Sequence, residues 1–110
     1  MADEDREHTP RVNSARLADF IGKTIRLPCK VLKVDGERLT VEAADGGQVA
    51  VNATPNADVS DTFIEVIGKV NSPSSIQMLA SISMGSDLDM KLVNDTIELI
   101  HDRRFYNRMF

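Results

Sequence analysis

The feature that most constrains the fold is a series of five short segments in which apolar residues alternate with other residues. These segments span residues 24–34, 37–43, 47–52, 63–70 and 75–84. Because successive side chains of a β-strand point to opposite faces, this period predicts strands with one buried face. The pairs Asp35-Gly36 and Asp45-Gly46 separate the first three segments and predict a meander of hairpins.

The first and last segments carry more specific expectations. The apolar face of the first consists of Ile25, Leu27, Cys29 and Val31. Pro28 interrupts it, and because proline cannot donate a ladder hydrogen bond we predict a bulge or bend there. The last segment alternates strictly through Ile76, Met78, Ala80, Ile82 and Met84. Met78 and Met84 are therefore expected at core positions.

Five short strands with helices only at the ends are typical of a small antiparallel barrel. A chain of 110 residues is long enough for one such domain. Residues 53–62 contain Pro55 and several turn-forming residues, and they break the pattern between the third and fourth strands. This break favours the five-stranded Greek-key barrel of the OB-fold over its main competitor, an SH3-like barrel. The predicted class is all-β, with a short N-terminal and a long C-terminal helix.

The flanking segments complete the predicted organisation. Residues 1–9 are polar and acidic, and we expect a disordered tail. A short helix follows within the barrel domain, residues 10–85. Asn13 or Ser14 is expected to cap this helix and Gly22 to end it. Its predicted apolar side consists of Leu17, Phe20 and Ile21. A helix over 86–104 and a tail over 105–110 follow.

The composition argues against catalysis and against metal or cofactor binding. A single cysteine, Cys29, permits no internal disulfide and no cysteine-built zinc site. His8 and His101 have no companions at metal-ligand spacing, and no phosphate-binding glycine loop is present. We predict that the chain is not an enzyme, with no cofactor, no metal and no small-molecule substrate. The acidic N-terminus resembles no targeting signal, and no apolar run suits a membrane span, so an intracellular protein is expected.

Direct binding of single-stranded nucleic acid is an alternative that the charge distribution leaves open. The net charge of −4 disfavours a protein that mainly binds phosphates, but basic residues gather near the first strand. The candidate contacts are Arg26, Lys30, Lys33 and Arg38. Single-strand binding also uses aromatic stacking platforms, and the second and third strands carry no aromatic residue. This alternative is therefore a weak, independent binding module that uses the basic first strand.

The predicted terminal helix is more apolar than a surface helix requires. Ser86, with Asp89 three residues later, is its expected N-cap. At about 100° per residue, one apolar lobe consists of Leu88, Leu92 and Leu99. The other consists of Met90, Val93, Ile97 and Ile100. Together they span roughly 200°, about twice the stripe that packing on one surface needs.

Two interpretations account for this excess. In the first, the helix plugs one end of the barrel with both lobes. In the second, one lobe meets the barrel and the other meets helices of a partner. We favour the second, because a barrel of this size cannot easily cover both lobes. The predicted partner-binding residues are Leu88, Met90, Leu92, Val93, Ile97, Leu99, Ile100 and Phe105.

Three segments resemble a known family in order and spacing. They are "RVNSARLADFIGK", "FIEVIGKV" and "KLVNDTIELIHD", within a resemblance that runs from Pro10 to Arg104. The family is the smallest subunit of replication protein A, the eukaryotic single-stranded-DNA-binding heterotrimer. The ending "RRFYNRMF" departs from longer members. A telomere-type OB subunit with other partners is a further alternative.

The resemblance implies a non-catalytic subunit that serves assembly. Its C-terminal helix would join one helix from each of the middle and large subunits in a three-helix bundle. It also implies a nuclear complex that coats single strands in DNA replication, repair and recombination, with most DNA affinity in the other chains. Leu88 to Ile100 carry over as the interface helix, whereas no specific DNA contact carries over.

Overall fold

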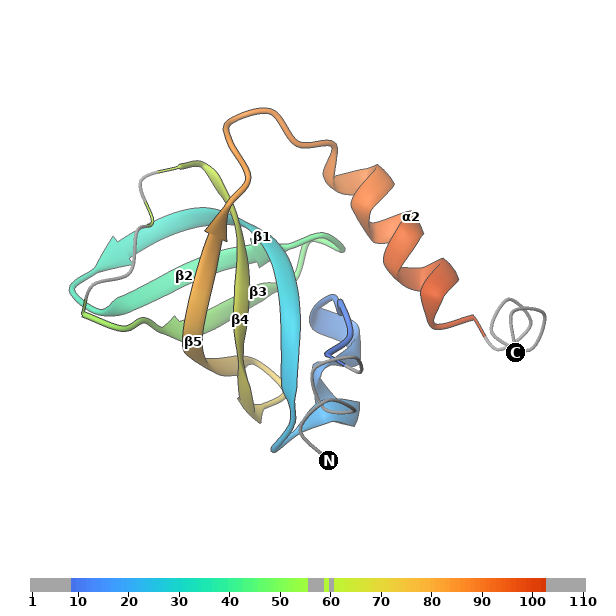
Figure 1. Cartoon of the computed structure of the whole chain (residues 1–110), viewed down its shortest axis with the longest axis horizontal. Helices are drawn as coiled ribbons and strands as arrows, with labels where there is room; N and C mark the ends of the chain where they lie inside the picture. The colour runs from blue at the N-terminus through green and yellow to red at the C-terminus, as the bar shows by residue number, and fades with distance from the viewer. Residues whose placement is uncertain (1–8, 56–58, 60, 103–110) are drawn as a thin grey trace.

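The computed structural model describes residues 9–55, 59 and 61–102, and within them five strands close into one barrel (Figure 1). The strands are β1 (Thr24–Asp35), β2 (Arg38–Ala43), β3 (Gln48–Asn52), β4 (Phe63–Ser72) and β5 (Ser75–Ser83). Their order around the barrel is β1-β2-β3-β5-β4. Two helices flank it, the 3₁₀ helix η1 (Ser14–Phe20) and the α-helix α2 (Met90–Ile100). The predicted five-stranded, OB-like barrel is confirmed.

The connections explain where the sequence pattern breaks. β1, β2 and β3 pair antiparallel as the predicted meander. β3 then pairs in parallel with β5, while β4 pairs antiparallel with both β1 and β5. A parallel pair cannot be joined by a tight hairpin. The chain must therefore leave β3 and cross to β4 before β5 can close the barrel, and residues 53–62 make that crossing.

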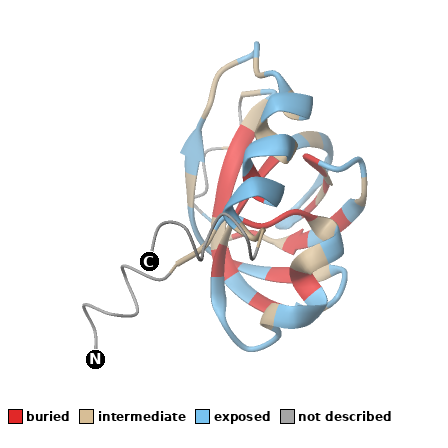
Figure 2. Ribbon diagram, turned by 90° about the vertical axis from the view of Figure 1, so that its right-hand side faces the viewer, coloured by how far each residue is buried: buried red, intermediate tan, exposed pale blue. Residues whose placement is uncertain are grey.

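The core lies inside the barrel and is built almost entirely from the alternating residues of the strands (Figure 2). Its largest fully buried members from the strands are Ile25, Leu27, Leu39, Ile64, Ile76 and Met78. Val12 and Leu17, from the N-terminal segment and η1, complete it. The predicted tail 1–9 lies outside the described residues except for Thr9.

The predicted bulge in β1 exists but lies at a different position. The register with β2 shifts between Val31 and Lys33, so the bulge is near Leu32. Of the predicted bulge or bend at Pro28, the bulge was wrong, because the register shows no shift there. The amide of Arg26 donates to the Pro10 carbonyl at 2.9 Å. Because strand residues two apart face the same side, the nitrogen of Pro28 also points away from β4. Its missing N–H therefore removes no hydrogen bond from that ladder.

A second bulge, in β5, divides the predicted core positions of that strand. Gly68 pairs with Met78 but Ile67 pairs with Ala80, so Leu79 is an extra residue. A Cβ on Gly68 would lie 2.4 Å from the Gln77 carbonyl oxygen, so the strands approach too closely there for any larger residue. The bulge reverses the alternation beyond Met78.

The predicted core position of Met84 was therefore wrong. Ile76 and Met78 are buried in the barrel, whereas Ala80 is exposed and Ile82 is 48% exposed. Met84 follows the end of β5, and its side chain is partly buried outside the barrel. The strict alternation in the sequence could not reveal this change of face, because the extra residue, Leu79, is itself apolar.

The short N-terminal helix is confirmed, but its capping differs from the prediction. Asn13 occupies the N-cap position without a side-chain capping bond. Instead the carboxylate of Asp45 accepts from the backbone amides of Ser14, at 3.2 Å, and Ala15, at 3.1 Å. The predicted apolar residue Ile21 lies beyond the end of the helix, where it forms an isolated bridge with Val70, and it is 50% exposed.

The terminal helix begins four residues later than predicted. Asp89 is its N-cap, and the carboxylate accepts from the amide of Leu92 at 3.0 Å. The prediction that Ser86 caps the helix is wrong. A capping box has Glu or Gln three residues after the cap, whereas here the shorter Asp89 is itself the cap residue. The helix ends at Ile100, and the predicted end at Arg104 lies outside the described residues.

Candidate partner-binding site

The structure separates the two apolar lobes of α2. Ile97 is 1% exposed and Val93 is partly buried, so this lobe faces the rest of the molecule. Leu92 is 61% exposed and Leu99 is 50% exposed on the other side. Ile100, which the sequence groups with the first lobe, is 40% exposed. Most of the helix surface seen in Figure 2 is exposed, in contrast to the buried strands behind it.

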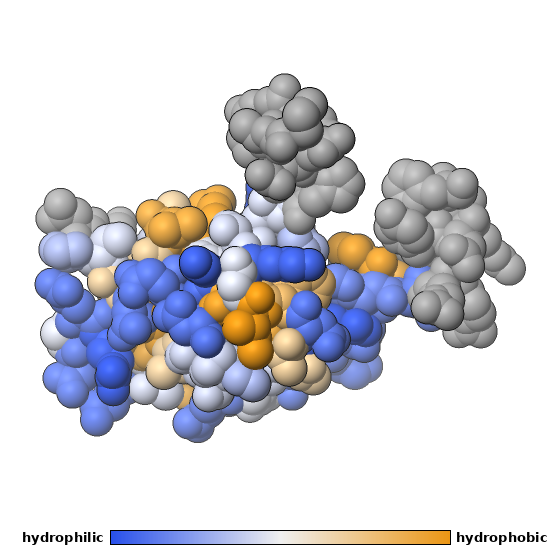
Figure 3. All heavy atoms as spheres, turned by 90° about the horizontal axis from the view of Figure 1, so that it is seen from below, coloured by the Kyte–Doolittle hydropathy of each residue, from blue (hydrophilic) through white to orange (hydrophobic). Residues whose placement is uncertain are grey.

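We call Leu92, Leu99 and Ile100 the outer face of α2. With successive residues about 100° apart, these three side chains fall within roughly 100° of arc, which is the width of an ordinary packing stripe. Figure 3 shows that apolar side chains also reach the surface elsewhere, in separate groups among polar residues. The outer face differs because its large apolar residues lie along one side of a single helix, as helices that pack on other helices require.

A set of polar side chains, the polar clasp, ties the middle and the end of α2 to the N-terminal segment. It consists of Asn13, Arg16, Asn94 and Glu98. The Asn13 amide donates to the Asn94 side-chain oxygen at 2.8 Å and to Glu98 at 2.7 Å. Arg16 makes a bidentate ion pair with Glu98, with both bonds at 2.9 Å. Such planar pairing fixes orientation as well as position.

The electrostatics of the clasp favour an ionised Glu98. Hydrogen bonds from Arg16 and then from Asn13 lower the pKa of this carboxyl below its ordinary value, against a small opposing effect of burial. Asn13 is 2% exposed, and its own side-chain oxygen has no partner among the described residues. In the clasp, the buried side-chain amide of Asn13 therefore donates to the ionised, half-exposed carboxylate of Glu98.

His101 adds a contact at the end of the helix. Its Nε2 lies 2.8 Å from the Arg11 carbonyl oxygen, which can only accept, so Nε2 carries the proton and donates. The His101 ring also meets the edge of Phe20, with centroids 5.9 Å apart. Within the described part of the chain, no cluster of three metal-ligating side chains occurs.

Sequence reasoning missed the clasp. Asn13 stood out only as a candidate helix cap, and Arg16 was not among the candidate site residues. Their partners lie more than 80 positions away, at Asn94 and Glu98, so no local spacing connects them. The only signal in the sequence was that α2 has a polar side, and this did not indicate which residues that side contacts.

The remaining predicted partner-binding residues are distributed around the helix. Met90, in the first turn of the helix, is partly buried, and so is Leu88, which precedes the helix. Phe105 lies outside the described residues.

Among the helices that the structure describes, none has the length and apolar character to cross a membrane.

The four candidate nucleic-acid contacts do not form one compact site. Arg26 and Lys33 both belong to β1, and at about 3.3 Å per strand residue they lie roughly 20 Å apart. Lys30 pairs across the ladder with Glu42, which offsets its charge, and Arg38 pairs with Asp35. The barrel surface around them has no aromatic residue from β2 or β3.

The fold and this helix together define a class of protein: a small OB-like barrel with an appended helix whose outer apolar face is uncovered. The chain belongs to the family described as replication factor A protein 3, whose profile matches residues 1–105. It is 31% identical over 103 residues to replication factor A protein 3 of Schizosaccharomyces pombe, covering 93% of this chain and 94% of the relative.

Solved structures agree with this assignment. A chain in the structure of U. maydis replication protein A bound to ssDNA matches with a TM-score of 0.79 and 38% identity, covering 83% of this chain and 87% of that chain. A chain of the S. pombe Stn1-Ten1 complex matches with a TM-score of 0.69, covering 84% and 91%, but at 10% identity. The second match shows the fold alone.

Proposed function

We propose that this chain is a non-catalytic structural subunit of a heterotrimeric single-stranded-DNA-binding complex. In this proposal α2 joins one helix each from the middle and large subunits of replication protein A in a three-helix bundle. The complex acts in the nucleus, in DNA replication, repair and recombination. Membership of the replication factor A protein 3 family supports the complex, and the likeness to a chain of a replication protein A structure bound to ssDNA supports its ligand.

The observation that carries the proposal is the uncovered outer face of α2. Leu92 and Leu99 lie seven residues apart, which places them on the same side of the helix two turns apart. This is the spacing of a helix–helix seam. Their exposure leaves apolar area in water that a partner helix would remove, at about 25 cal/mol per Å².

DNA affinity is assigned mainly to the partner subunits. The four basic residues are spread along β1 and β2, and Glu42 opposes one of them. A positively charged groove with stacking platforms is therefore not assembled from them. The isolated chain is expected to bind single strands only weakly, even at low salt, where phosphate contacts are strongest.

The test is co-purification after co-expression with the two partner subunits. The double substitution Leu92→Asp and Leu99→Asp should abolish recovery of the trimer, because it would bury two charges in an apolar seam. Val34→Asp is the matched control: Val34 is 53% exposed, like Leu99, but lies on the barrel. It should leave the trimer intact. Normal trimer recovery with the double variant would overturn the proposal.

A further inference from the structure

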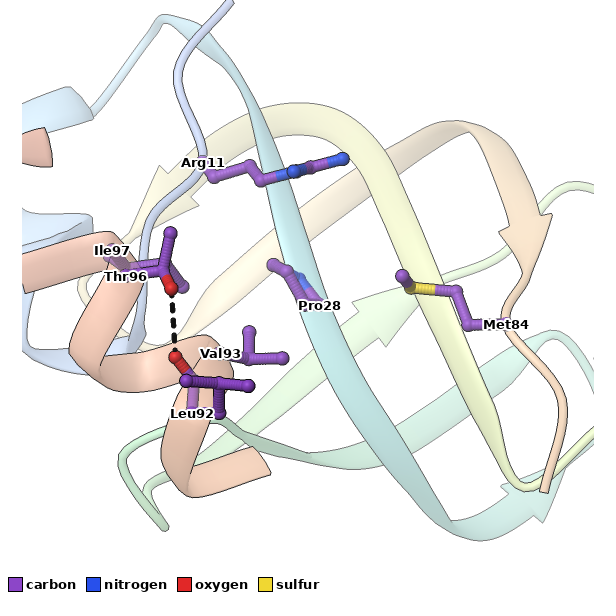
Figure 4. A pocket seen from close by; sticks show the side chains of 7 residues that line it. All are labelled: Arg11, Pro28, Met84, Leu92, Val93, Thr96 and Ile97. Carbon is purple, nitrogen blue, oxygen red and sulfur yellow. Dashed lines mark hydrogen bonds between the residues drawn. The ribbon is translucent and has the colours of Figure 1, made fainter. Parts of the chain in front are cut away.

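A groove lies between α2 and the outer surface of the barrel. It has a volume of about 210 Å³ and is largely apolar. Its lining residues are Arg11, Pro28, Met84, Leu92, Val93, Thr96 and Ile97. Figure 4 shows that Pro28 and Met84 come from the barrel side and the last four from α2.

The fold itself accounts for the groove. The polar clasp holds α2 through Asn94, near the middle of the helix, and Glu98, near its end. Leu92, Val93, Thr96 and Ile97 line the groove from a different side of the helix than Asn94 and Glu98. On the opposite side, the bulge at Leu79 sends the side chain of Met84 outward instead of into the core. One wall thus results from the clasp and the other from the bulge.

The polar groups at the groove have partners within the chain. The Thr96 hydroxyl donates to the Leu92 carbonyl at 2.9 Å (Figure 4). The Arg11 Nε donates to Glu65 at 2.7 Å, and the Glu65 side chain is only 3% exposed. The Thr96 hydroxyl and the Arg11 Nε thus donate within the chain, and the other lining side chains are apolar, so the groove favours an apolar occupant. Its volume is also below the roughly 300–1,000 Å³ of ordinary small-molecule sites.

We propose that this groove receives an apolar side chain from the partner helix that packs on the outer face of α2. Leu92 belongs both to the outer face and to the groove lining, so the two surfaces are continuous. The barrel, through Met84 and Pro28, then forms a second wall of the subunit interface. This inference rests on the proposed function and extends it from a helix–helix contact to a helix held between α2 and the barrel.

Thiol labelling measures occupation of the groove from the barrel side. The variant Met84→Cys places one reactive thiol at the groove. The native Cys29 stays silent, because burial and then the nearby Glu65 raise its pKa to about 12. Ala50→Cys is the matched control, since Ala50 is exposed on β3, a strand that pairs with neither β1 nor β4. Each variant is labelled as free chain and as purified trimer.

The Met84→Cys thiol should react at least about tenfold more slowly in the trimer than in the free chain, while the Ala50→Cys thiol reacts alike in both. Equal rates for Met84→Cys in both states would overturn the inference. So would a rate in the free chain that falls with protein concentration, because a second copy of the chain would then be the occupant.

Equilibrium assembly gives an independent measurement if the cysteine variant folds poorly. Met84→Glu should weaken trimer assembly by at least about tenfold, while Met84→Leu keeps it near the wild-type level. If Met84→Glu assembles normally while Leu92→Asp with Leu99→Asp does not, the groove inference fails and the proposed function stands. If neither affects assembly, both fail.

Discussion

The barrel and the terminal helix bury their apolar residues to very different extents. In the barrel the alternating residues of five strands enclose one another, and Leu27, Val41 and Ile64 have no exposed surface. In α2 only Ile97 is fully buried, while Leu92 and Leu99 are at least half exposed. The barrel thus buries the apolar residues of its strands within one chain, whereas the helix buries the apolar residues of only one side.

The way each region is held follows from this difference. Every strand of the barrel pairs with a neighbour on each side, so the barrel is closed and has no free edge. The helix is held by side chains, through the Arg16 and Asn13 bonds to Glu98 and the burial of Ile97. The barrel thus buries its apolar residues within the chain itself. Polar contacts hold the helix in position and leave its apolar outer face available.

The largest expected effect contrasts a core leucine with an outer-face leucine. Leu27→Ala should destabilise the free chain by about 2–5 kcal/mol, because it leaves a cavity in the closed barrel. Leu92→Ala should change stability by less than about 0.5 kcal/mol, because that side chain is already in solvent. Urea unfolding of both variants measures the difference. Similar losses would mean that α2 is as integral to the free fold as the barrel.

A smaller loss of stability is expected from a substitution at the β5 bulge, the feature of the barrel that turns Met84 toward the groove beside α2. Gly68→Ala should destabilise the free chain by about 1–3 kcal/mol, because its Cβ would press on the Gln77 carbonyl and the Ile76 side chain. Ala80→Ser, at an exposed position of the same ladder, is the control and should be nearly neutral. If Gly68→Ala is as stable as wild type, the close approach of β4 and β5 does not determine the bulge.

The smallest effect concerns the clasp and appears only in acid. The pKa of Glu98 is lowered in the folded chain, so its stabilising contribution is present above the ordinary value of 4.5. That contribution is lost as the pH falls through the lowered folded value. NMR signals of the Phe20 and His101 rings should therefore shift on acidification from about pH 6 to about pH 3, as the end of α2 loosens.

The variant Glu98→Gln isolates this effect. It should already show the loosened ring signals at neutral pH and lose the acid-dependent step at α2. Asp45 also has a lowered pKa: burial alone would raise it, but hydrogen bonds from Ser14, Ala15 and Gly47 outweigh that effect. Asp45 therefore contributes a separate acid step at η1. An unchanged acid step at α2 in Glu98→Gln would show that Glu98 does not control the clasp.

The local sequence pattern was sufficient to predict the strands, but it was insufficient to predict their bulges and the start of α2. Period-two alternation located all five strands to within about two residues, because each strand has one buried face. The bulges at Leu32 and Leu79 could not be predicted, because each extra residue is itself apolar. The start of α2 was placed too early, because Ser86 and Asp89 both suit a cap and only the structure distinguishes them.

The candidate site shows the same division. The sequence by itself determined that α2 has two apolar lobes and that a small barrel cannot easily cover both, because helical period and composition are local properties. Only the tertiary structure decided that the lobe of Ile97 faces inward, that Asn13 and Arg16 hold Glu98, and that Met84 lies in a groove. These depend on contacts between segments far apart in the chain, which no local pattern encodes.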